Sequence, residues 1–539
     1  MSKTGLRVNL PSAVDNADGL RKLEHYYGIE FTRGASNGGG ENGYHQMIGD
    51  ATLLKEMRFH NQIKIAAVKD AAIKTVLNQS NWRQQEDGVT ASVLDGSDGT
   101  DIMQVHTTTV YAILGGSNPT YERYIVSDKP FSYEGDEAKA YESYGETPDY
   151  ATMVGNVLRS ISGDSAVGTQ VAGMGSNYSD PAMGIANGVG RPRTSLTRFA
   201  FEAAARAKNA DASKNLPHTI ICNQDIELAF AFMAIEFRTK IFNTLLGHGV
   251  SSNAAPSAAT WGKISGYRMT SDGGATYLFG TLGQSLFVNG STTGTAMWQI
   301  INGYSPLLKM FEAQLAVSDG ATLEQVKDAD GNVITAPMTG IWTKTFTFQI
   351  TASTTAGGEA KLYTVEVCLR VPMWRGRTRL WGHLAQWTGG YECVRYLDSE
   401  GKTHHKVYRA PSVEALTTDS DVALKTAEGG FVFENTYDYL GELPVTTTAR
   451  PQWATQMFSK DNIMTAITQL EGGSMLNYEG SANFVGVETE TGKYRRMGAR
   501  FGDRANSGGS AVLRFAYVGN EPSNANSNFG SGFRVKLSA

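Results

Sequence analysis

The last stretch of the chain, residues 496–537, constrains the fold most strongly, because it mixes two kinds of residue that chains usually keep apart. The strand-forming apolar set is Ala511, Val512, Leu513, Phe515, Phe533 and Val535. The polar and aromatic set is Asp503, Arg504, Asn506, Ser507, Arg514, Tyr517 and Asn520. Adaptable polar side chains and rigid rings are typical of contact surfaces. The sequence therefore predicts a small terminal sheet with a buried face and an outward face of contact residues.

Composition indicates a globular, β-rich protein. A length of 539 residues favours roughly two to four domains. An apolar content of 41% and a charged content of 19% suit a chain with a substantial core. The 60 glycines against 15 prolines predict many turns between strands rather than a proline-rich linker. A net charge of −5 gives no support to a nucleic-acid or membrane-surface partner.

The three cysteines, Cys222, Cys368 and Cys393, form neither a CxxC motif nor a Cys/His cluster, so neither a zinc site nor a disulfide framework is expected. A Cys368–Cys393 bridge is one alternative, and burial as free thiols is the favoured one. The N-terminus lacks the apolar core of a signal peptide. No run of roughly 18 apolar residues occurs, so no membrane insertion is expected and the chain should be made in the cytoplasm.

The first 90 residues are predicted to contain an arm and helices. Residues 18–27 suit a helix capped by Asp18, and the Gly/Asn-rich run 33–43 suits a flexible arm. Apolar residues at roughly helical spacing predict a longer helix over 51–79, with Asp50 as its N-cap. That helix serves either oligomerisation and attachment or packing within its own domain, and the sequence leaves both alternatives open.

Further elements follow along the chain. Strands are predicted at 102–113, 121–126, 218–222, 343–350 and 362–371, and a long structured loop at 134–190. Helices are predicted at 193–208 and at 226–246, the second capped by Asn223 and apolar nearly all round. The segment 374–391 packs three tryptophans and a tyrosine around glycines, which favours burial in the core over a sugar-stacking platform.

Several polar groups invite a metal or catalytic interpretation, but each has a simpler one. Asp95, Asp98 and Asp101 lack the ligand ladder of an EF-hand, so turn chemistry is favoured, and Asp328 to Asn332 is predicted to be a hairpin turn. His404 and His405 are adjacent, so on a strand they would face opposite ways, and a solvated loop is favoured. Glu488 and Glu490 share a strand face without any sign of an opposing carboxylate across a cleft.

Three blocks, in this order, resemble the C-type lectin fold in its formylglycine-generating-enzyme-like form. They are the helix–strand–helix pattern of 194–246, the Gly/Trp segment from Leu380 to Gly390, and the closing segment from Pro522 to Val535. The closing segment is similar to the end of the variable proteins diversified by retroelements, including phage major tropism determinants. The segment 94–103, with 127–131, resembles the lead-in found in phage tail proteins. The resemblance covers roughly 90–539.

The resemblance implies an α+β, β-rich lectin-like domain with two helices over 91–539, preceded by an attachment or oligomerisation region over 1–90. A β insertion is expected at about 250–370 and a variable ligand-binding region at about 496–537. The implied contact residues are Phe501, Asp503, Arg504, Asn506, Ser507, Arg514, Ala516, Tyr517, Gly519 and Asn520. Tyr517, Phe501 and Arg514 are the expected anchors, because aromatic residues and Arg dominate binding hot spots.

The function implied is a phage receptor-binding protein of the tail or fibre tip, a virion protein that contacts a host surface protein or glycan. Other tail proteins would bind the N-terminal region, and a homotrimer is expected. The alternative is a virion decoration protein whose lectin-like domain only packs against neighbouring subunits. A bacterial surface protein is disfavoured by the missing export signal. No enzyme activity, cofactor or metal is expected, because the oxidising enzyme of this fold uses cysteines in its last part, whereas Cys393 is the last here.

Overall fold

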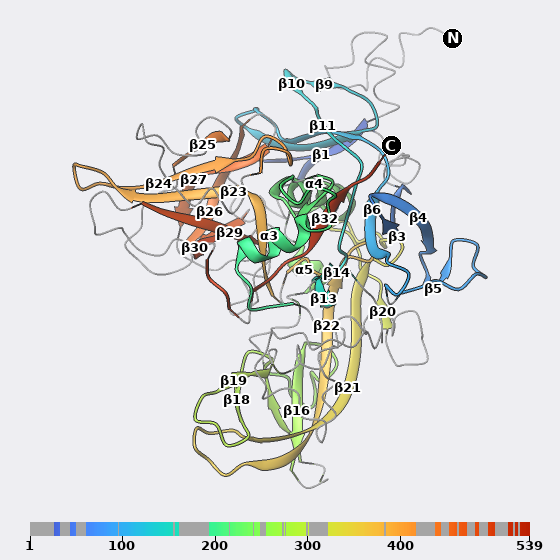
Figure 1. Ribbon diagram of the computed structural model, residues 1–539, viewed down its shortest axis with the longest axis vertical. Helices are drawn as coiled ribbons and strands as arrows, with labels where there is room; N and C mark the ends of the chain where they lie inside the picture. Colours follow the sequence, from blue (N-terminus) through green and yellow to red (C-terminus); the bar gives the residue numbers. More distant parts are fainter. Residues whose placement is uncertain are drawn as a thin grey trace.

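The computed structural model describes most of the chain. The described residues are 26–32, 44–49, 61–94, 96–154, 157–160, 193–214, 216–240, 242–247, 249, 255–271, 274, 276–297, 300, 322–381, 384–416, 437–442, 452–460, 463–471, 480–483, 494–501, 516–520, 523–526 and 529–538. Between 452 and 520 the description covers backbone pairing alone. Within these residues the architecture is a β-rich α+β fold, with four sheets of five or more strands and three helices, which confirms the predicted class (Figure 1).

Two sheets bring the N-terminal strands into the body of the molecule. The five-stranded sheet has the order β11 (Lys139–Tyr141), β7 (Val110–Gly115), β8 (Tyr121–Ser127), β1 (Tyr26–Thr32) and β2 (Tyr44–Ile48). The central seven-stranded sheet has the order β15 (His218–Ile220), β32 (Phe533–Lys536), β12 (Tyr144–Glu146), β6 (Asp101–His106), β3 (Ile63–Lys69), β4 (Ala72–Asn78) and β5 (Asn81–Gln85). The last strand of the chain therefore lies inside a sheet built mainly from its first third.

A second seven-stranded sheet forms an elongated lobe at the bottom of Figure 1. Its strands are β17 (Leu278–Gly280), β16 (Gly266–Thr270), β22 (Lys361–Met373), β21 (Gly340–Ser353), β18 (Ser285–Val288) and β19 (Thr295–Ala296), with β20 (Thr322–Glu324) beside β21. The long β21–β22 hairpin carries the strands predicted at 343–350 and 362–371. In the segment between β20 and β21, Asp328 donates its backbone N–H to the Asn332 carbonyl at 2.8 Å, which confirms the predicted hairpin turn.

The nine-stranded sheet holds the part of the chain with the predicted contact residues. Its order is β25 (Asp438–Glu442), β24 (Thr403–Arg409), β23 (Ala385–Leu397), β29 (Tyr494–Phe501), β30 (Ala516–Asn520), β28 (Gly480–Asn483), β26 (Gln452–Lys460) and β27 (Ile463–Glu471), with β31 (Phe529–Gly530) beside β23. Two short hairpins complete the strands, β9 (Ser132–Tyr133) with β10 (Asp136–Glu137) and β13 (Thr152–Val154) with β14 (Val157–Arg159).

The helices are α3 (Arg198–Arg206), α4 (Asn223–Phe237) and α5 (Asn243–Leu246). Because α4 is apolar nearly all round, it is buried along almost its whole length, at the centre of Figure 1. It packs against β1, β7 and β8 and shares a core cluster with Trp374, Trp381 and Tyr391. All three tryptophans of 374–391 are buried, with Trp387 edge-on to Phe529. The segment is core, as predicted.

The helix predicted over 51–79 is wrong, because its described part forms the hairpin β3–β4. The turn is made by Asp70 and Ala71, both at positive φ, and Lys69 pairs with Ala72 across it. Two-residue hairpin turns of this kind are usually recognised in a sequence by Asn-Gly or Asp-Gly at the turn. Ala71 in place of glycine gives no such signal, and the apolar residues around it are spaced as well for a helix as for two strands.

Other boundaries also need correction. Tyr26 and Tyr27, the described end of the helix predicted over 18–27, belong to β1. The strand predicted over 102–113 is two strands, β6 and β7, in different sheets, and the predicted loop 134–190 contains β10 to β14 in its described part. The helix predicted over 226–246 ends at Phe237, because Arg238 adopts a left-handed conformation. Cys222, not Asn223, is the N-cap of α4.

The burial of β32 generates a stability prediction. The Phe533 side chain is 0% exposed. Replacing it by Ala should lower the free energy of unfolding by about 3–5 kcal/mol, because a large cavity would be left in the central sheet. Denaturant unfolding monitored by tryptophan fluorescence measures this loss. Leu362→Ala is the control, since Leu362 is 53% exposed, and equal losses for both variants would contradict the burial of β32.

Candidate functional site

The predicted contact residues fall in the nine-stranded sheet where they are described. Phe501 ends β29, and Ala516, Tyr517, Gly519 and Asn520 lie on β30. The two strands are antiparallel neighbours, with Arg500 opposite Tyr517 and Gly498 opposite Asn520. Half of the predicted set is thus brought together on two adjacent strands. The other half, Asp503, Arg504, Asn506, Ser507 and Arg514, lies outside the described residues, as do Glu488 and Glu490.

On its other edge, β29 is hydrogen-bonded to β23, a deeply buried strand of the nine-stranded sheet. The residues of β23 from Ala385 to Val394 are all buried. The pairing is interrupted by a bulge between Trp387 and Glu392, and bulges bend a strand and increase its twist locally. The two strands that carry the predicted contact residues are therefore held against a buried strand, β29 directly and β30 through β29.

Beyond β30, the chain returns to the core through β31 and β32. Phe529 and Phe533 are buried, and Ser531 donates its hydroxyl to the Trp387 carbonyl at 2.9 Å. Gly532 passes so close to the central sheet that a Cβ there would collide with Thr147 Oγ1. Glycine is required at this close approach. The predicted contact segment is consequently fixed on both sides, by β23 before it and by β32 after it.

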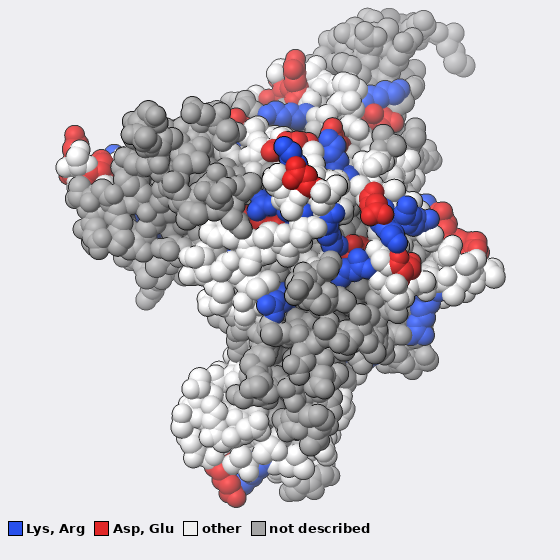
Figure 2. Space-filling model, in the orientation of Figure 1, with Lys and Arg blue, Asp and Glu red and all other residues white. Residues whose placement is uncertain are grey.

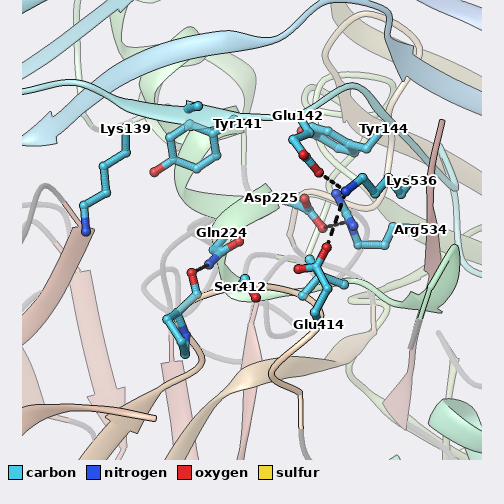
Figure 3. Close-up of a pocket in the computed structure, with 13 residues that line it drawn as sticks. Lys139, Tyr141, Glu142, Tyr144, Gln224, Asp225, Ser412, Glu414, Arg534 and Lys536 are labelled. Carbon is cyan, nitrogen blue, oxygen red and sulfur yellow. Dashed lines mark hydrogen bonds and ion pairs between the residues drawn. The ribbon is translucent and has the colours of Figure 1, made fainter. Parts of the chain in front are cut away.

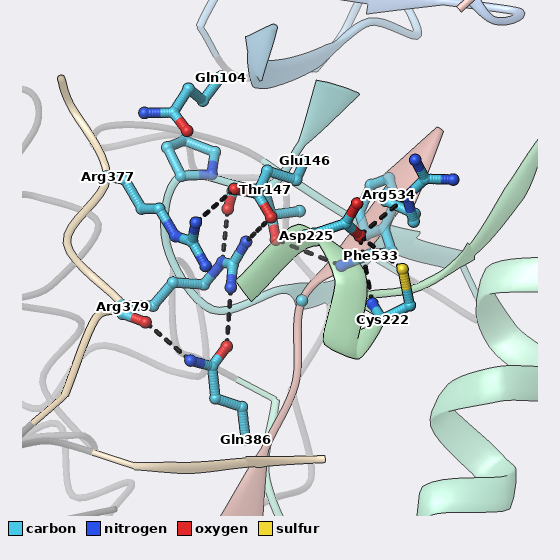
Figure 4. Close-up of polar contacts among 12 residues, drawn as sticks. Gln104, Glu146, Thr147, Cys222, Asp225, Arg377, Arg379, Gln386, Phe533 and Arg534 are labelled. Carbon is cyan, nitrogen blue, oxygen red and sulfur yellow. Dashed lines mark hydrogen bonds and ion pairs between the residues drawn. The ribbon is translucent and has the colours of Figure 1, made fainter. Parts of the chain in front are cut away.

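A buried ionic network lies beside the closing strand (Figure 4). Glu146 on β12 pairs with Arg377 at 2.6 Å and accepts a hydrogen bond from Arg379 at 2.9 Å. Arg379 also donates to the Gln386 side chain at 2.7 Å. Burial alone would raise the pKa of Glu146, but Arg377 and Arg379 outweigh it and hold that pKa below its usual value. The network links β12 to the start of β23 through the ion pairs of Glu146 and the hydrogen bond from Arg379 to Gln386.

A second buried pair joins the closing strand to α4. Arg534 Nε lies 2.9 Å from the carboxylate of Asp225, which also accepts from the Cys222 backbone N–H at 3.2 Å. The Arg534 guanidinium lies 4.9 Å from the Tyr144 ring centroid. Burial raises the pKa of Asp225, with Arg534 opposing it. Since Asp225 stands in the first turn of α4, its charge also complements the helix dipole.

The three cysteines are buried and free, as favoured from the sequence. Burial raises the pKa of Cys222 well above its usual value and that of Cys393 to about 12. Because the thiolate is the reactive form, both thiols are inert at neutral pH. The side chains thus behave as small apolar residues of the core.

The adjacent histidines lie on strand β24, not in the solvated loop that the sequence favours. They do point to different environments: His405 is buried, whereas His404 is partly exposed between Asp398 and Glu442, at 2.8 Å and 2.9 Å. Burial would lower the pKa of His404, but the two carboxylates outweigh it and raise that pKa. Among the described residues no group of three or more His, Cys, Asp or Glu is placed to hold a metal ion.

Of the three aspartates for which turn chemistry is predicted, Asp98 acts in a turn, whereas Asp101 is the buried first residue of β6. Asp98 Oδ1 accepts from the Thr100 backbone N–H at 2.9 Å, and Asp101 is an ion-pair partner of Lys208. Asp95 lies outside the described residues. On the described face shown in Figure 2, acidic and basic side chains alternate and form no broad patch of a single sign. Such interspersed charge does not steer a highly charged partner.

The structure also contains a cavity that sequence reasoning missed (Figure 3). Its volume is about 290 Å³, and its lining residues come from β11, β12, the start of α4, the loop after β24, and β32. The lining residues are Lys139, Ala140, Tyr141, Glu142, Tyr144, Gln224, Asp225, Pro411, Ser412, Val413, Glu414, Arg534 and Lys536. They are spread over about three-quarters of the chain, so no local motif could have revealed them.

No family model matches the chain, and a search of curated proteins finds no match either. No helix in the described ranges is both long and apolar enough to cross a membrane.

From the ionic network we predict that removing the charge of a buried glutamate costs much more stability than removing that of an exposed one. Glu146→Gln should lower the free energy of unfolding by about 3–5 kcal/mol, because Arg377 and Arg379 would keep their charges without a buried counter-ion. Glu86→Gln, which breaks an exposed pair with Lys64, should cost about 1 kcal/mol or less. Chemical denaturation of both variants tests this, and a small loss for Glu146→Gln would contradict the network's role.

Asp149 predicts a pH-dependent stability. Burial raises the pKa of this carboxyl from 3.8 to about 7. A carboxyl with a raised pKa in the folded state contributes stability at low pH that is lost as the pH rises through the folded value. The free energy of unfolding should therefore fall by up to about 4 kcal/mol between about pH 4 and pH 7 through this group.

The Asp149→Asn variant should lack this component of the pH profile, while the exposed Glu359→Gln variant should keep it. Thermal unfolding across the same pH range measures both. Identical profiles for wild type and Asp149→Asn would show that the carboxyl stays ionised in the folded protein.

Proposed function

We propose that this chain is a phage receptor-binding protein of the tail or fibre tip, which displays a variable, C-type-lectin-like surface to a host receptor. The proposed partner is a host surface protein or glycan, bound by a homotrimer whose N-terminal region attaches to other virion proteins. The proposed contact surface is centred on β29 and β30. The chain would then act by binding and not as an enzyme.

The proposal rests on the buried strands β23 and β32, which hold the predicted contact segment at its two ends. The predicted contact residues with described positions lie on two adjacent strands, β29 and β30. The segment is preceded by pairing to the buried strand β23 and followed by the buried strand β32. Exposed substitutions away from such buried features usually change stability by about 0.5 kcal/mol or less. A segment held in this way tolerates a change of contact chemistry without loss of the fold.

Support for the lectin-like part of the proposal comes from contacts among the three blocks that carry the resemblance. The strand β15, between α3 and α4, pairs directly with the closing strand β32. The Gly/Trp block joins them, because Gly389 donates its backbone N–H to the Ile221 carbonyl at 2.9 Å and Trp387 packs on Phe529. Blocks that are distant in sequence thus form one hydrogen-bonded and packed unit.

The proposal predicts that Tyr517→Ala and Arg514→Ala each weaken adsorption of virions to host cells by about tenfold or more, because truncated hot-spot residues typically cost about 2 kcal/mol of binding free energy. Adsorption-rate measurements on particles that carry each variant test this. Purified variant protein should also lose its ability to compete with wild-type particles for the host surface.

A matched control is Tyr439→Ala. Tyr439 lies on β25 of the same nine-stranded sheet and is 43% exposed, yet it lies outside the predicted contact segment. Its variant should adsorb normally. If the Tyr517 and Arg514 variants also adsorb normally while particles assemble in reduced numbers, the chain is a virion decoration protein instead.

A further inference from the structure

His404 lies between two carboxylates that belong to different elements of the nine-stranded sheet. Asp398 Oδ2, in the segment between β23 and β24, is 2.8 Å from the Nε2 atom of the ring. Glu442 Oε2, at the end of β25, is 2.9 Å from the Nδ1 atom. The His404 side chain is only 15% exposed. Both nitrogen atoms of one partly buried ring are thus within hydrogen-bond distance of an acceptor.

This geometry fits one protonation state of the ring. An ionised carboxylate only accepts hydrogen bonds, whereas a neutral imidazole donates from one nitrogen and accepts at the other. A neutral His404 would therefore direct a lone pair at one of the two carboxylates. The imidazolium ion donates to both of them. The site is consequently built for the charged form of histidine.

The other titratable side chains around the ring are Tyr396 on β23, Lys406 and His405 on β24, and Tyr439 on β25. Tyr396 stacks on the His404 ring, with the two centroids 4.9 Å apart. Lys406 lies opposite Glu442 in the strand register and adds a second cation to this face of the sheet. Burial raises the pKa of Tyr439 and lowers that of His405 to about 4, so both are neutral around pH 7. Within this group, His404 is the side chain whose charge can change near neutral pH.

Strand β25 is also held at its other end. Arg409 donates a hydrogen bond to Asp438, the first residue of β25, at 2.7 Å. Between the two ends the pairing of β25 with β24 shifts register, and Gly441 adopts a φ of 142°, which favours glycine. Leu440, just before this shift, is buried in the core. Because arginine keeps its charge at any pH at which proteins are folded, the tie at Asp438 does not depend on pH.

From these contacts we propose that His404, Asp398 and Glu442 form a proton-dependent clamp. The clamp fastens the Glu442 end of β25 to the nine-stranded sheet, and that end is released about Gly441 when the ring loses its proton. The tie between Arg409 and Asp438 and the burial of Leu440 keep the rest of the strand in place. The pH therefore controls one end of an edge strand and leaves the sheet intact.

The direction of the pH dependence follows from the surroundings of the ring. Burial would lower the pKa of His404, but Asp398 and Glu442 outweigh it and raise that pKa. A histidine with a raised pKa in the folded protein contributes stability that is complete below the unfolded value, about 6.5, and is lost as the pH rises through the folded value. The clamp is thus closed in mildly acidic solution and opens as the solution becomes alkaline.

The first test is an NMR titration of the full-length protein with ring-labelled histidine, in which the His404→Gln variant identifies the His404 signal. The pKa of His404 should lie above that of free histidine. Glu442→Gln and Asp398→Asn should each lower it, because each variant removes one charged acceptor. His405 is the internal control, since its pKa should lie well below that of free histidine in the wild type and in both carboxylate variants.

The second test is backbone hydrogen exchange in a peptide that covers residues 438–442, corrected for the intrinsic pH dependence of exchange. Protection in the wild type should fall about twofold to fivefold from pH 6 to pH 9, the size expected for a partly exposed ion pair. His404→Gln should show the lower protection at every pH. Asp438→Asn is the matched control, because it removes the permanent tie and should lower protection throughout while the step with pH remains.

Two results would overturn the proposal. A His404 pKa at or below that of free histidine, or one that neither carboxylate variant changes, would mean that the carboxylates do not hold the ring in its charged form. Protection of residues 438–442 that stays constant while His404 titrates would mean that the charge of the ring does not hold β25. Neither measurement involves adsorption to a host, so the clamp and the receptor-binding function are tested separately.

Discussion

The pairing of β32 with β12 on one side and β15 on the other is the constraint on which the rest of the structure depends. It joins the end of the chain to strands more than 300 residues away, so its formation closes a very long loop. Burial of Phe533 and Val535 offsets that entropy, since both side chains leave water completely. Once β32 is in place, the cavity and the return of the chain from β30 are both determined.

Buried charge gives this arrangement its specificity more than its stability. Glu146 meets two arginines and Arg534 meets Asp225, and all of these groups are removed from water. Desolvation consumes much of the attraction within such pairs, so apolar replacements can be equally stable. A shifted register of β32, however, would leave Arg534 and Asp225 without each other. A shift by one residue would already move Phe533 and Val535 to the wrong face, and the ion pairs also penalise a shift by two residues, which would keep the apolar face.

The sequence predicted what depends on local pattern. Local pattern predicted the apolar helix α4, the strands β21 and β22 and the buried tryptophans, because their periodicity and composition are unambiguous. The β3–β4 hairpin was not, since Asp70 and Ala71 form its turn without a glycine. The ionic network and the cavity also could not be predicted from the sequence. Glu146 and Arg379 are 233 residues apart, and only the tertiary fold brings them together.

The physical separation between the contact strands and the cavity has a consequence for how each can change. The cavity is lined by residues of three sheets, so substitutions in its lining act on the junction between these sheets. Side chains on β29 and β30 belong to one sheet, next to the buried strand β23. In the proposed function, substitutions on these two strands change the affinity for a partner while the residues of the junction stay the same. Substitutions on β29 and β30 therefore leave the residues that join the three sheets unchanged.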